Sequence, residues 1–565
     1  MIWNFRPYDP GLARVLATEL GRPLKFGEFL TARGFRGAQE ARDFLSGELR
    51  GLPAPETLPG LERAVELFLE ARRQKKIVAI VGDYDVDGLT ATALMWRILR
   101  DLGYEVITRV PNRLTEGYGL SPLAVRELLE RGAGLLVTVD CGVSDQEAIE
   151  LADQAGLPVV VTDHHQLPPK LPKAQAILNP HLGEAWKSHP LAGVGVAFML
   201  AWGLQRALKR EGVELSVSLV EHLALVALGS VADLAPLRGP NRILVRHGLN
   251  FLARCAWPGL VALRRKALRN EGQVTTRDVG FRLGPRINAA GRLGQAEIAL
   301  ELLLATDQAK AEELAERLEA LNQTRLREQS RLLEEAMEKL ADQELESEGA
   351  RVVVLAGAGW PRGILGLAAT RVAELTNRPT IILSVDGDLA VGSGRSVAGF
   401  NLFEALEPLR DLCLSLGGHA QAAGLKIQVA QLPRFRAALE VAAQRQAPPP
   451  VEPELDVDLL VDLPDLAVIA PILAKMEPFG PSNPAPVAVA RGTAVLEASP
   501  TRTGGDQHMM LRLFDGSTRV NLVGFGLAPR LPEIGSRLDV AVMLETERFG
   551  RPEPNWRLLD FKAPA

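Results

Sequence analysis

Short apolar runs alternate with amphipathic stretches in the first part of the chain. The runs occupy residues 75–81, 106–110, 134–139 and 158–161, and helix-like segments such as 89–102 and 123–131 lie between them. Strands that alternate with helices are typical of a parallel α/β sheet. The pattern therefore predicts an α/β domain that begins soon after a short helical segment at the amino terminus.

The hydrophobic pattern changes twice further along the chain. Residues 306–346 are charged and contain neither proline nor glycine, which predicts one or two long helices joining domains. A second, smaller α/β region follows, with strands expected at 352–355 and 380–383, and the proline-rich segment 447–453 is typical of a stiff linker. Beyond it, short alternating runs with glycine turns predict a small five-stranded barrel: 487–497, 509–514, 519–525, 538–546 and 556–561.

These patterns predict two α/β domains joined by long helices and followed by a β-barrel. A chain of 565 residues is too long for one hydrophobic core, at roughly 100–200 residues per domain. The expected boundaries are a helical segment 1–50, a first α/β domain 51–305, connecting helices 306–350, a second α/β domain 351–446, a linker 447–456 and a barrel domain 457–565.

Composition narrows the class of protein. With 47% hydrophobic and 24% charged residues, the chain is neither disordered nor a fibrous repeat. Its three cysteines are far apart, so neither a disulfide framework nor a zinc ribbon is expected. No signal peptide or membrane span is predicted, and we expect a cytoplasmic protein. The net charge of −5 gives no global support for binding a polyanion, so any such site needs locally gathered arginines.

Acidic residues and histidines follow the predicted strands. Asp83, Asp85 and Asp87 come after the first strand, Asp140 after 134–139, and an Asp-His-His triplet after 158–161. Asp233 follows a further apolar stretch, 223–231. The carboxyl ends of parallel strands share one edge of a sheet, so these side chains should converge. Clustered carboxylates need cations, and carboxylates with one or two imidazoles suit Mn²⁺ or Mg²⁺ better than zinc.

Each feature also has a simpler interpretation. The D-x-D-x-D-G segment at 83–88 matches the start of an EF-hand loop, but position twelve is Leu94 rather than glutamate and the segment follows a strand. Single acids after strands are often only solvated, and a histidine pair can simply start a helix in a polar loop. Gly193-Val194-Gly195 follows no strand and lacks a ribose-binding acid, which argues against a dinucleotide site.

Several motifs, in order, resemble the DHH phosphoesterase family. They are DYDVDG at 83–88, VDCG at 139–142, DHH at 163–165, GSVAD at 229–233, and GGH at 417–419 with AAG at 422–424. The PNR segment at 111–113, EGYGL at 116–120, PRINAAGR at 285–292 and EPFGP at 477–481 resemble its RecJ branch. The sequence departs from the family at Pro361, where a histidine is usual after the tryptophan.

The resemblance implies a fold and an activity. The expected parts are a DHH domain, a DHHA1 domain and a carboxyl-terminal OB fold. The implied function is a two-metal phosphodiesterase, a single-strand-specific 5′-to-3′ DNA exonuclease that releases 5′-mononucleotides in recombination and repair, with Mn²⁺ or Mg²⁺ as its two ions. Implied partners are single-stranded DNA, a single-stranded-DNA-binding protein and a helicase, and a monomer is expected.

The resemblance also assigns roles to residues of this chain. Implied metal ligands are Asp83, Asp85, Asp87, Asp140, His164 and Asp233. His165 and Asp163 are implied catalytic residues; Arg113, Arg286, Ser393, Arg395, His419 and Tyr118 are implied to bind DNA or its 5′-phosphate. One carboxylate can ligate two ions about 3.5–4 Å apart, which makes Asp140 the best candidate for a bridge.

Structural roles remain open for several of these residues. Asp163 could instead cap a helix, as could His419, and the arginines could form salt bridges between domains. Tyr118 and Trp360 could stack on bases or pack in a core. The barrel segment carries arginines and aromatic residues suited to a single strand. They are Arg491, Arg502, Arg512, Arg519, Arg537, Arg548, Arg551 and Arg557, with Phe514, Phe525, Phe549 and Trp556.

Two other functions fit parts of the sequence. A phosphodiesterase of the same superfamily, acting on short oligoribonucleotides or cyclic dinucleotides, would resemble the two α/β domains alone and would not need the barrel. A non-catalytic replication scaffold resembling RecJ would be expected to lose metal ligands, whereas every acid of the motifs and the DHH triplet are present here.

Overall fold

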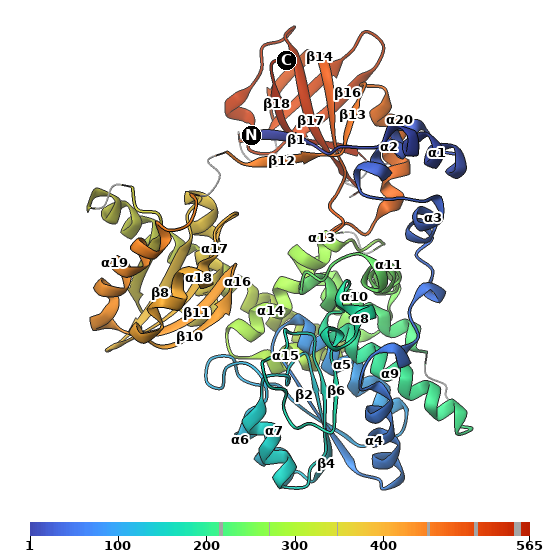
Figure 1. Cartoon of the computed structure of the whole chain (residues 1–565), viewed down its shortest axis with the longest axis vertical. Coiled ribbons are helices and arrows are strands. Elements are labelled where there is room, and N and C mark those ends of the chain that lie inside the picture. The colour runs from blue at the N-terminus through green and yellow to red at the C-terminus, as the bar shows by residue number, and fades with distance from the viewer. Residues whose placement is uncertain are drawn as a thin grey trace.

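The computed structural model describes residues 1–213, 218–269, 272–346, 349–448, 452–501, 507–546 and 555–564. Two α/β domains and a β-barrel surround the centre of the molecule, with the barrel above the first domain and the second domain to one side (Figure 1). Residues 449–451 of the expected linker and Arg502, Arg548, Phe549 and Arg551 of the barrel lie outside the described residues.

The first domain contains a five-stranded parallel sheet, as predicted, in the order β3-β2-β4-β5-β6. Gly82 of β2 pairs with Val139 of β4, and Val139 pairs with Thr162 of β5. The three strands therefore end in one row, and an aspartate follows each of them directly. The strands are β2 (Ile77–Gly82), β3 (Val106–Arg109), β4 (Ala133–Val139), β5 (Val159–Thr162) and β6 (Ala176–Leu178).

Helices cover both faces of this sheet. On one face, α6 (Pro122–Glu130) and α7 (Gln146–Gln154) bury a small apolar cluster. On the other face, a larger cluster joins the sheet to α4, α5 and the following helices. These are α4 (Leu61–Arg73), α5 (Val86–Asp101), α8 (Glu184–Lys187), α9 (Gly193–Arg210), α10 (Leu223–Ala232), α11 (Gly239–Arg254), α12 (Pro258–Ala267), α13 (Thr276–Asp278), the π-helix η5 (Val279–Leu283), α14 (Gly284–Arg292) and α15 (Ala296–Leu304).

The apolar stretch before Asp233 is not a strand. It forms α10, a helix whose residues 223–231 are all buried. A short apolar run has the same appearance whether it is a buried strand or a buried helix, so its period could not distinguish the two. The sequence-based expectation that Asp233 stands at a strand end is therefore wrong, because Asp233 is the C-cap residue of α10.

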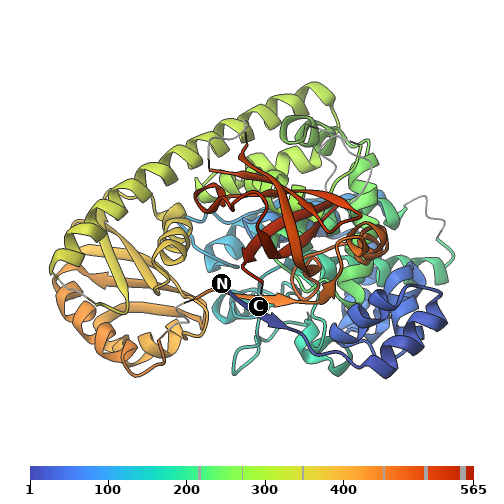
Figure 2. The same ribbon diagram turned by 90° about the horizontal axis from the view of Figure 1, so that it is seen from above.

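A single 39-residue helix, α16 (Gln308–Glu346), connects the two α/β domains. At 1.5 Å per residue it extends for roughly 58 Å, and it forms one edge of the molecule in Figure 2. The second domain has a mixed sheet in the order β10-β11-β9-β8-β7. Its elements are β7 (Val353–Ala358), α17 (Leu365–Thr376), β8 (Thr380–Asp386), β9 (Leu389–Arg395), α18 (Leu402–Leu406), β10 (Cys413–His419), β11 (Ala422–Gln428) and α19 (Leu432–Ala443).

The carboxyl-terminal strands close into a barrel, as expected for an OB fold. Five strands follow the order β14-β15-β16-β18-β17, and pairing of β14 with β17 closes the circle. The strand β13 (Leu459–Val461) adds to β14 from outside, and α20 (Asp465–Leu473) packs against the barrel core. The barrel strands are β14 (Val487–Pro500), β15 (Met509–Phe514), β16 (Arg519–Gly524), β17 (Arg537–Glu545) and β18 (Asn555–Lys562).

The amino terminus packs against the barrel as well as the domain that follows it. Strand β1 (Ile2–Phe5) pairs in parallel with β12 (Glu454–Val457), which begins inside the expected linker 447–456 and ends one residue beyond it. Helices α1 (Pro10–Leu20), α2 (Leu24–Ala32) and α3 (Ala38–Ser46) share the apolar core of the barrel. Arg33 binds both carboxylate oxygens of Asp458 at 2.5 and 2.6 Å, in a buried ion pair. None of the helices in the described ranges has the length and hydropathy needed to cross a bilayer.

Candidate metal centre and adjoining arginine cluster

The carboxylates of the first motif lie at the start of α5. Asp83 directly follows β2, and Asp85 caps α5 by accepting a hydrogen bond from Gly88 N at 3.1 Å. Asp87 is almost fully buried and accepts hydrogen bonds from Gly193 N at 2.6 Å and Val194 N at 2.9 Å. These two amides form the first turn of α9, so its N-terminus holds the Asp87 carboxylate in place.

Asp140 lies between the first motif and the DHH triplet. Its φ of +61° is in the left-handed region, which is unfavourable for a residue with a side chain. Its amide donates to Thr162 O at 2.9 Å, and this bond ties the turn to the neighbouring strand end. Gly193 lies so close that an added Cβ would be 2.5 Å from Asp140 Cβ. The glycine therefore leaves the space that the Asp140 side chain occupies.

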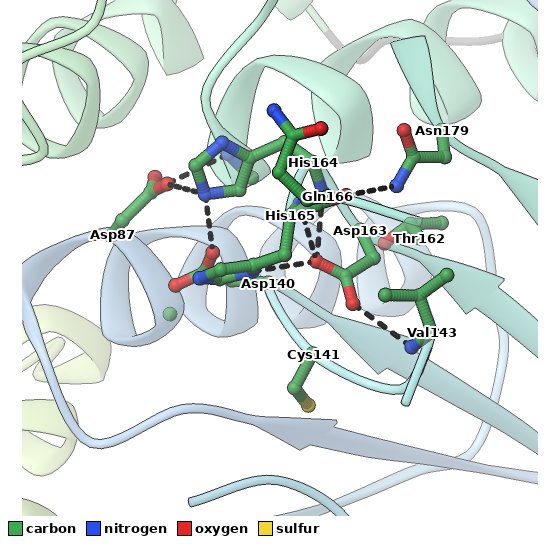
Figure 3. A network of polar contacts seen from close by, with 12 residues as sticks. Asp87, Asp140, Cys141, Val143, Thr162, Asp163, His164, His165, Gln166 and Asn179 are labelled. Atoms are coloured by element: carbon green, nitrogen blue, oxygen red, sulfur yellow. Dashed lines mark hydrogen bonds and ion pairs between the residues drawn. The ribbon is translucent and has the colours of Figure 1, made fainter. Parts of the chain in front are cut away.

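His164 brings three of the carboxylates together. Its Nε2 lies 3.0 Å from Asp140 Oδ1, 3.8 Å from Asp87 Oδ2 and 3.7 Å from Asp233 Oδ2. Figure 3 shows the first two of these contacts. Asp233 reaches the centre from the end of α10, although it does not follow a strand. The fold thus gathers the six predicted ligands, in overlapping groups whose ligand atoms lie within 4.8 Å of one another: Asp83, Asp85 and Asp140; Asp87, His164 and Asp233; and Asp140, His164 and His165.

The donor atoms fit divalent cations. Asp83 Oδ1 is buried and has no hydrogen-bond partner, and the buried atoms Asp140 Oδ1 and His164 Nε2 have no hydrogen bond beyond the ion-pair contacts around His164 Nε2. Burial and neighbouring carboxylates raise the pKa of Asp83, Asp87 and Asp140 well above the usual range, and raise the pKa of Asp233 to about 7. Burial also lowers the pKa of His164 to about 4, which favours the neutral ring that binds a metal. Two cations would satisfy these atoms and relieve the repulsion.

His165 belongs to a hydrogen-bond chain beside this centre. Asp163 Oδ1 lies 2.8 Å from His165 Nδ1 and accepts from the amides of His164 and His165, while Oδ2 accepts from Val143 N at 2.9 Å (Figure 3). Burial lowers the pKa of His165, but the Asp163 hydrogen bond and nearby carboxylates outweigh it and raise that pKa to about 9. The Tyr118 hydroxyl lies 3.0 Å from His165 Nδ1 and donates to Asp140 O at 3.0 Å.

Arginines from both α/β domains meet next to the metal centre. The Arg113 guanidinium lies over the Tyr84 ring at 4.9 Å, and Arg395 of the second domain donates to Ser393 Oγ at 3.0 Å. Arg292, at the end of α14, donates to Gly363 O of the second domain at 3.1 Å. Burial and the positive charges of Arg113, Arg325 and Arg395 lower the pKa of Arg292 to about 10. We call Arg113, Arg292, Arg325 and Arg395 the arginine cluster.

Two members of this cluster were not among the predicted site residues. Arg292 is part of the PRINAAGR motif, so its place in that motif was a usable signal. Arg325 lies in the long helix α16, where a charged sequence offers no such signal, and its guanidinium is held by Asn322 and Gln329 rather than by a carboxylate. Predicted Arg286, by contrast, forms an ion pair with Glu319 at 2.6 Å. Its charge is therefore matched within the protein, by a salt bridge to the connecting helix α16 rather than to the second domain.

Three further residues that the sequence singled out, Trp360, Arg362 and His419, lie on the second α/β domain. Trp360 is buried and donates to Glu335 at 2.7 Å, so it packs in a core and is not free to stack on a base. Arg362, beside Pro361, pairs with Asp386 at 3.1 Å. His419 is exposed at the end of β10 and accepts a hydrogen bond from Gln421 N at 3.3 Å. It lies on the second domain, and none of the candidate metal-binding groups among the described residues contains it.

The barrel arginines include several with aromatic or acidic neighbours. Arg557 lies over Phe525 and pairs with Glu545, Arg512 pairs with Glu497, and Arg519 lies over Phe514. Phe525 is 47% exposed, whereas Trp556 is buried in the barrel core and donates to Leu466 O. Of these two aromatic residues, only Phe525 presents its ring at the surface.

Comparisons with known proteins agree with this architecture. The chain matches the DHH family, N-terminal domain, over residues 77–229, the DHHA1 domain over 349–445 and the RecJ OB domain over 457–558. The single-stranded-DNA-specific exonuclease RecJ of Bacillus subtilis is 34% identical over 575 residues, covering 99% of this chain and 70% of the relative. The protein of the same name from Salmonella typhimurium is 36% identical, with 91% of this chain and 92% of the relative covered.

Two solved structures resemble this protein over its whole length. The crystal structure of RecJ from Thermus thermophilus in complex with Mn²⁺ has a TM-score of 0.83 and 32% identity, and the match covers 100% of this chain and 80% of that one. The same protein in complex with Mg²⁺ has a TM-score of 0.77 and 31% identity, with 100% and 79% covered. With DHH, DHHA1 and RecJ OB domains in this order, the chain belongs to the RecJ family.

Proposed function

We propose that this protein is a metal-dependent exonuclease that degrades single-stranded DNA from a 5′ end and releases 5′-mononucleotides. The observation that carries the proposal is the position of the arginine cluster, which joins both α/β domains directly beside a carboxylate–histidine metal centre. An anion-binding group next to metal ligands suits an enzyme that holds one phosphate while it hydrolyses another. The RecJ relatives, named single-stranded-DNA-specific exonucleases, support the substrate class.

The metal centre would hold two Mn²⁺ or Mg²⁺ ions through Asp83, Asp85, Asp87, Asp140, His164 and Asp233. Bound there, the ions would supply an activated water and stabilise charge on the scissile phosphate and leaving oxygen. The protein's own contribution is to hold the ligand carboxylates in position. The α9 amides fix Asp87. The strained turn at Asp140 places its carboxylate between Asp83 and Asp85 on one side and His164 on the other.

His165 would stabilise charge on the reacting phosphate. Asp163 holds its Nδ1, which leaves Nε2 as the nitrogen available to the substrate. The Asp163 carboxylate raises the pKa of this imidazole, and the protonated ring can donate a hydrogen bond from Nε2 to a phosphate oxygen. Tyr118 packs edge-on against the ring and limits its movement. Asp163 is therefore a positioning residue, whereas His165 would contact the substrate.

The arginine cluster would recognise the 5′ end. Guanidinium groups bind phosphate in a forked geometry, and Arg113 and Arg395 are predicted contacts for a terminal phosphate together with Ser393. Arg286 and His419 stay in the proposal as weaker candidates, because Arg286 is already paired with Glu319 and His419 lies at an exposed strand end. The barrel would bind the strand that follows.

The wider setting is proposed from the family. The protein would act as a monomer in the cytoplasm during recombination and repair, with a single-stranded-DNA-binding protein and a helicase as partners. The first alternative, hydrolysis of short oligoribonucleotides or cyclic dinucleotides, leaves the barrel without a role. The second, a non-catalytic scaffold, leaves the complete ligand set without one.

The test compares a single strand labelled at its 5′ end with the same strand labelled at its 3′ end, in the presence of Mn²⁺. The proposal predicts immediate release of labelled mononucleotide from the 5′-labelled strand and progressive shortening of the 3′-labelled one, both abolished by a chelator. Release of the 3′ label first, or faster hydrolysis of short oligoribonucleotides, would contradict it.

A further inference from the structure

The loop between β3 and α6 carries both the PNR motif and the EGYGL motif. Arg113, in the first motif, is proposed to bind the terminal phosphate. Glu116, in the second motif, is a half-buried acid only three residues away. A carboxylate beside a phosphate site repels the ligand unless a cation matches its charge. The presence of Glu116 at this place therefore calls for a role, and its contacts point to one.

Glu116 closes the turn that carries Arg113. Its Oε1 accepts a hydrogen bond from Asn112 N at 2.9 Å, and its own amide donates to Asn112 O at 2.8 Å. Burial raises the pKa of Glu116, but the hydrogen bonds from Asn112 N and Arg109 outweigh it and hold that pKa below its usual range, which keeps the carboxylate ionised. Because the two bonds join the ends of segment 112–116, they fix the backbone of Arg113 between them.

The parallel sheet anchors this turn through Arg109, the last residue of β3. Arg109 Nη2 donates to Glu116 Oε2 at 2.6 Å, and Arg109 Nε donates to Glu127 Oε2 of α6 at 2.7 Å. Strand pairing places Arg109 beside Val81, two residues before Asp83. Arg109 therefore matches the charge of Glu116 and connects the turn to a strand end that bears predicted metal ligands.

A second contact ties the same turn to the segment that follows α14. Asn112 Nδ2 donates to Gly294 O at 3.1 Å, two residues after Arg292 of the arginine cluster. Arg113 itself forms no ion pair within the described part of the chain, and its guanidinium lies over the Tyr84 ring at 4.9 Å. The backbone around Arg113 is thus held from two sides, while its charge stays available for a ligand.

We propose that Glu116 is a positioning residue that holds Arg113 in place for the 5′-terminal phosphate, with Arg109 fastening Glu116 to the sheet. This inference rests on the proposed function, because it needs end recognition by Arg113. A guanidinium on a loop loses conformational freedom when it binds a phosphate, and a turn that is already fixed reduces that cost. Glu116 acts through Arg113 and contacts neither the phosphate nor the metal ions.

The experiment measures kcat and KM of the full-length protein with Mn²⁺ on two strands of one sequence, one with a 5′-phosphate and one with a 5′-hydroxyl. Arg113→Ala should lose about ten- to a hundredfold of the preference for the phosphorylated strand, the range for one charged hydrogen bond. Glu116→Ala should lose about tenfold of it. The loss should come mainly from a raised KM for the phosphorylated strand, because the terminal phosphate does not react, and kcat/KM of the hydroxyl strand should stay within about threefold of wild type.

Two comparisons separate positioning from a general effect on the fold. Glu127→Ala is the matched control, because Glu127 binds the same Arg109 but forms no hydrogen bond to residues 112–116 within the described chain. Its side chain is 45% exposed, so the preference should stay within about threefold of wild type. Glu116→Gln, which keeps an acceptor for the turn, should fall between Glu116→Ala and wild type. The double variant Arg113→Ala/Glu116→Ala should lose no more of the preference than Arg113→Ala alone.

Three results would overturn the positioning role of Glu116. They are a preference equal to that of Glu127→Ala, an equal loss on both strands, and losses that add in the double variant with Arg113→Ala. The wild-type protein tests the proposed function separately. Equal cleavage of the two strands would refute end recognition by Arg113 and the positioning role with it, and cleavage of neither strand would refute the exonuclease and both roles.

Discussion

The substitution Gly193→Ala should disable the metal centre through a single added methyl group. The new Cβ would lie 2.5 Å from Asp140 Cβ and 2.6 Å from Asp140 Oδ1. Carbon atoms in contact are normally about 3.5–4.0 Å apart, so one of the two groups must move by about 1 Å. Asp140 is 2% exposed and sits in a strained turn, and Gly193 N binds Asp87, so either movement displaces a ligand. A misplacement of about 1 Å costs about a hundredfold in rate.

The assay measures kcat on a single-stranded oligonucleotide with Mn²⁺, together with Mn²⁺ affinity by calorimetry. Gly195→Ala is the control on the same helix, because the three atoms nearest to its added Cβ all belong to Leu191, at 3.2 Å or more, and none belongs to a predicted metal ligand. We expect Gly195→Ala to retain activity within about threefold, and Gly193→Ala to lose about a hundredfold and to bind Mn²⁺ more weakly. Equal kcat and equal Mn²⁺ affinity in the two variants would refute the steric argument.

Three further substitutions test other parts of the molecule. Asp140→Ala should abolish cleavage but leave single-strand binding, measured by fluorescence anisotropy, largely intact; a residual rate above about one hundredth of wild type would contradict its role as a bridging ligand. Arg395→Ala should lose about ten- to a hundredfold of the preference for a 5′-phosphate over a 5′-hydroxyl, in paired kinetic assays, and an equal loss on both ends would exclude end recognition. Arg33→Ala removes the two-oxygen partner of buried Asp458 and leaves Arg6 Nε, 3.5 Å away, as its remaining ion-pair contact, so it should lower the free energy of unfolding by about 3 kcal/mol in denaturant titrations; a change below about 1 kcal/mol would show that the pair does not fasten the amino-terminal helices to the barrel.

Local sequence was sufficient to bring together the aspartates that follow strands. Each of Asp83, Asp140 and Asp163 comes directly after a run of apolar residues, and parallel strands paired in register bring their ends together. The barrel and the long helix were also predictable, because alternation of period two recurs in the barrel strands and residues 306–346 are charged and contain neither proline nor glycine. In these cases the pattern and the tertiary structure depend on the same local geometry.

Other features depend on contacts between distant segments. The sequence could not distinguish helix from strand before Asp233, because a fully buried element is apolar on every side. Nor could it show that Glu319 neutralises Arg286, while Arg325 on α16 is held, within the described part of the chain, by the side-chain amides of Asn322 and Gln329. The pairing of β1 with β12 joins residues about 450 positions apart, and no local signal records such a pair. Local patterns determined which elements form, whereas packing between distant elements decided which of these charges are paired, because an ion pair such as Arg286–Glu319 needs α14 and α16 to lie side by side.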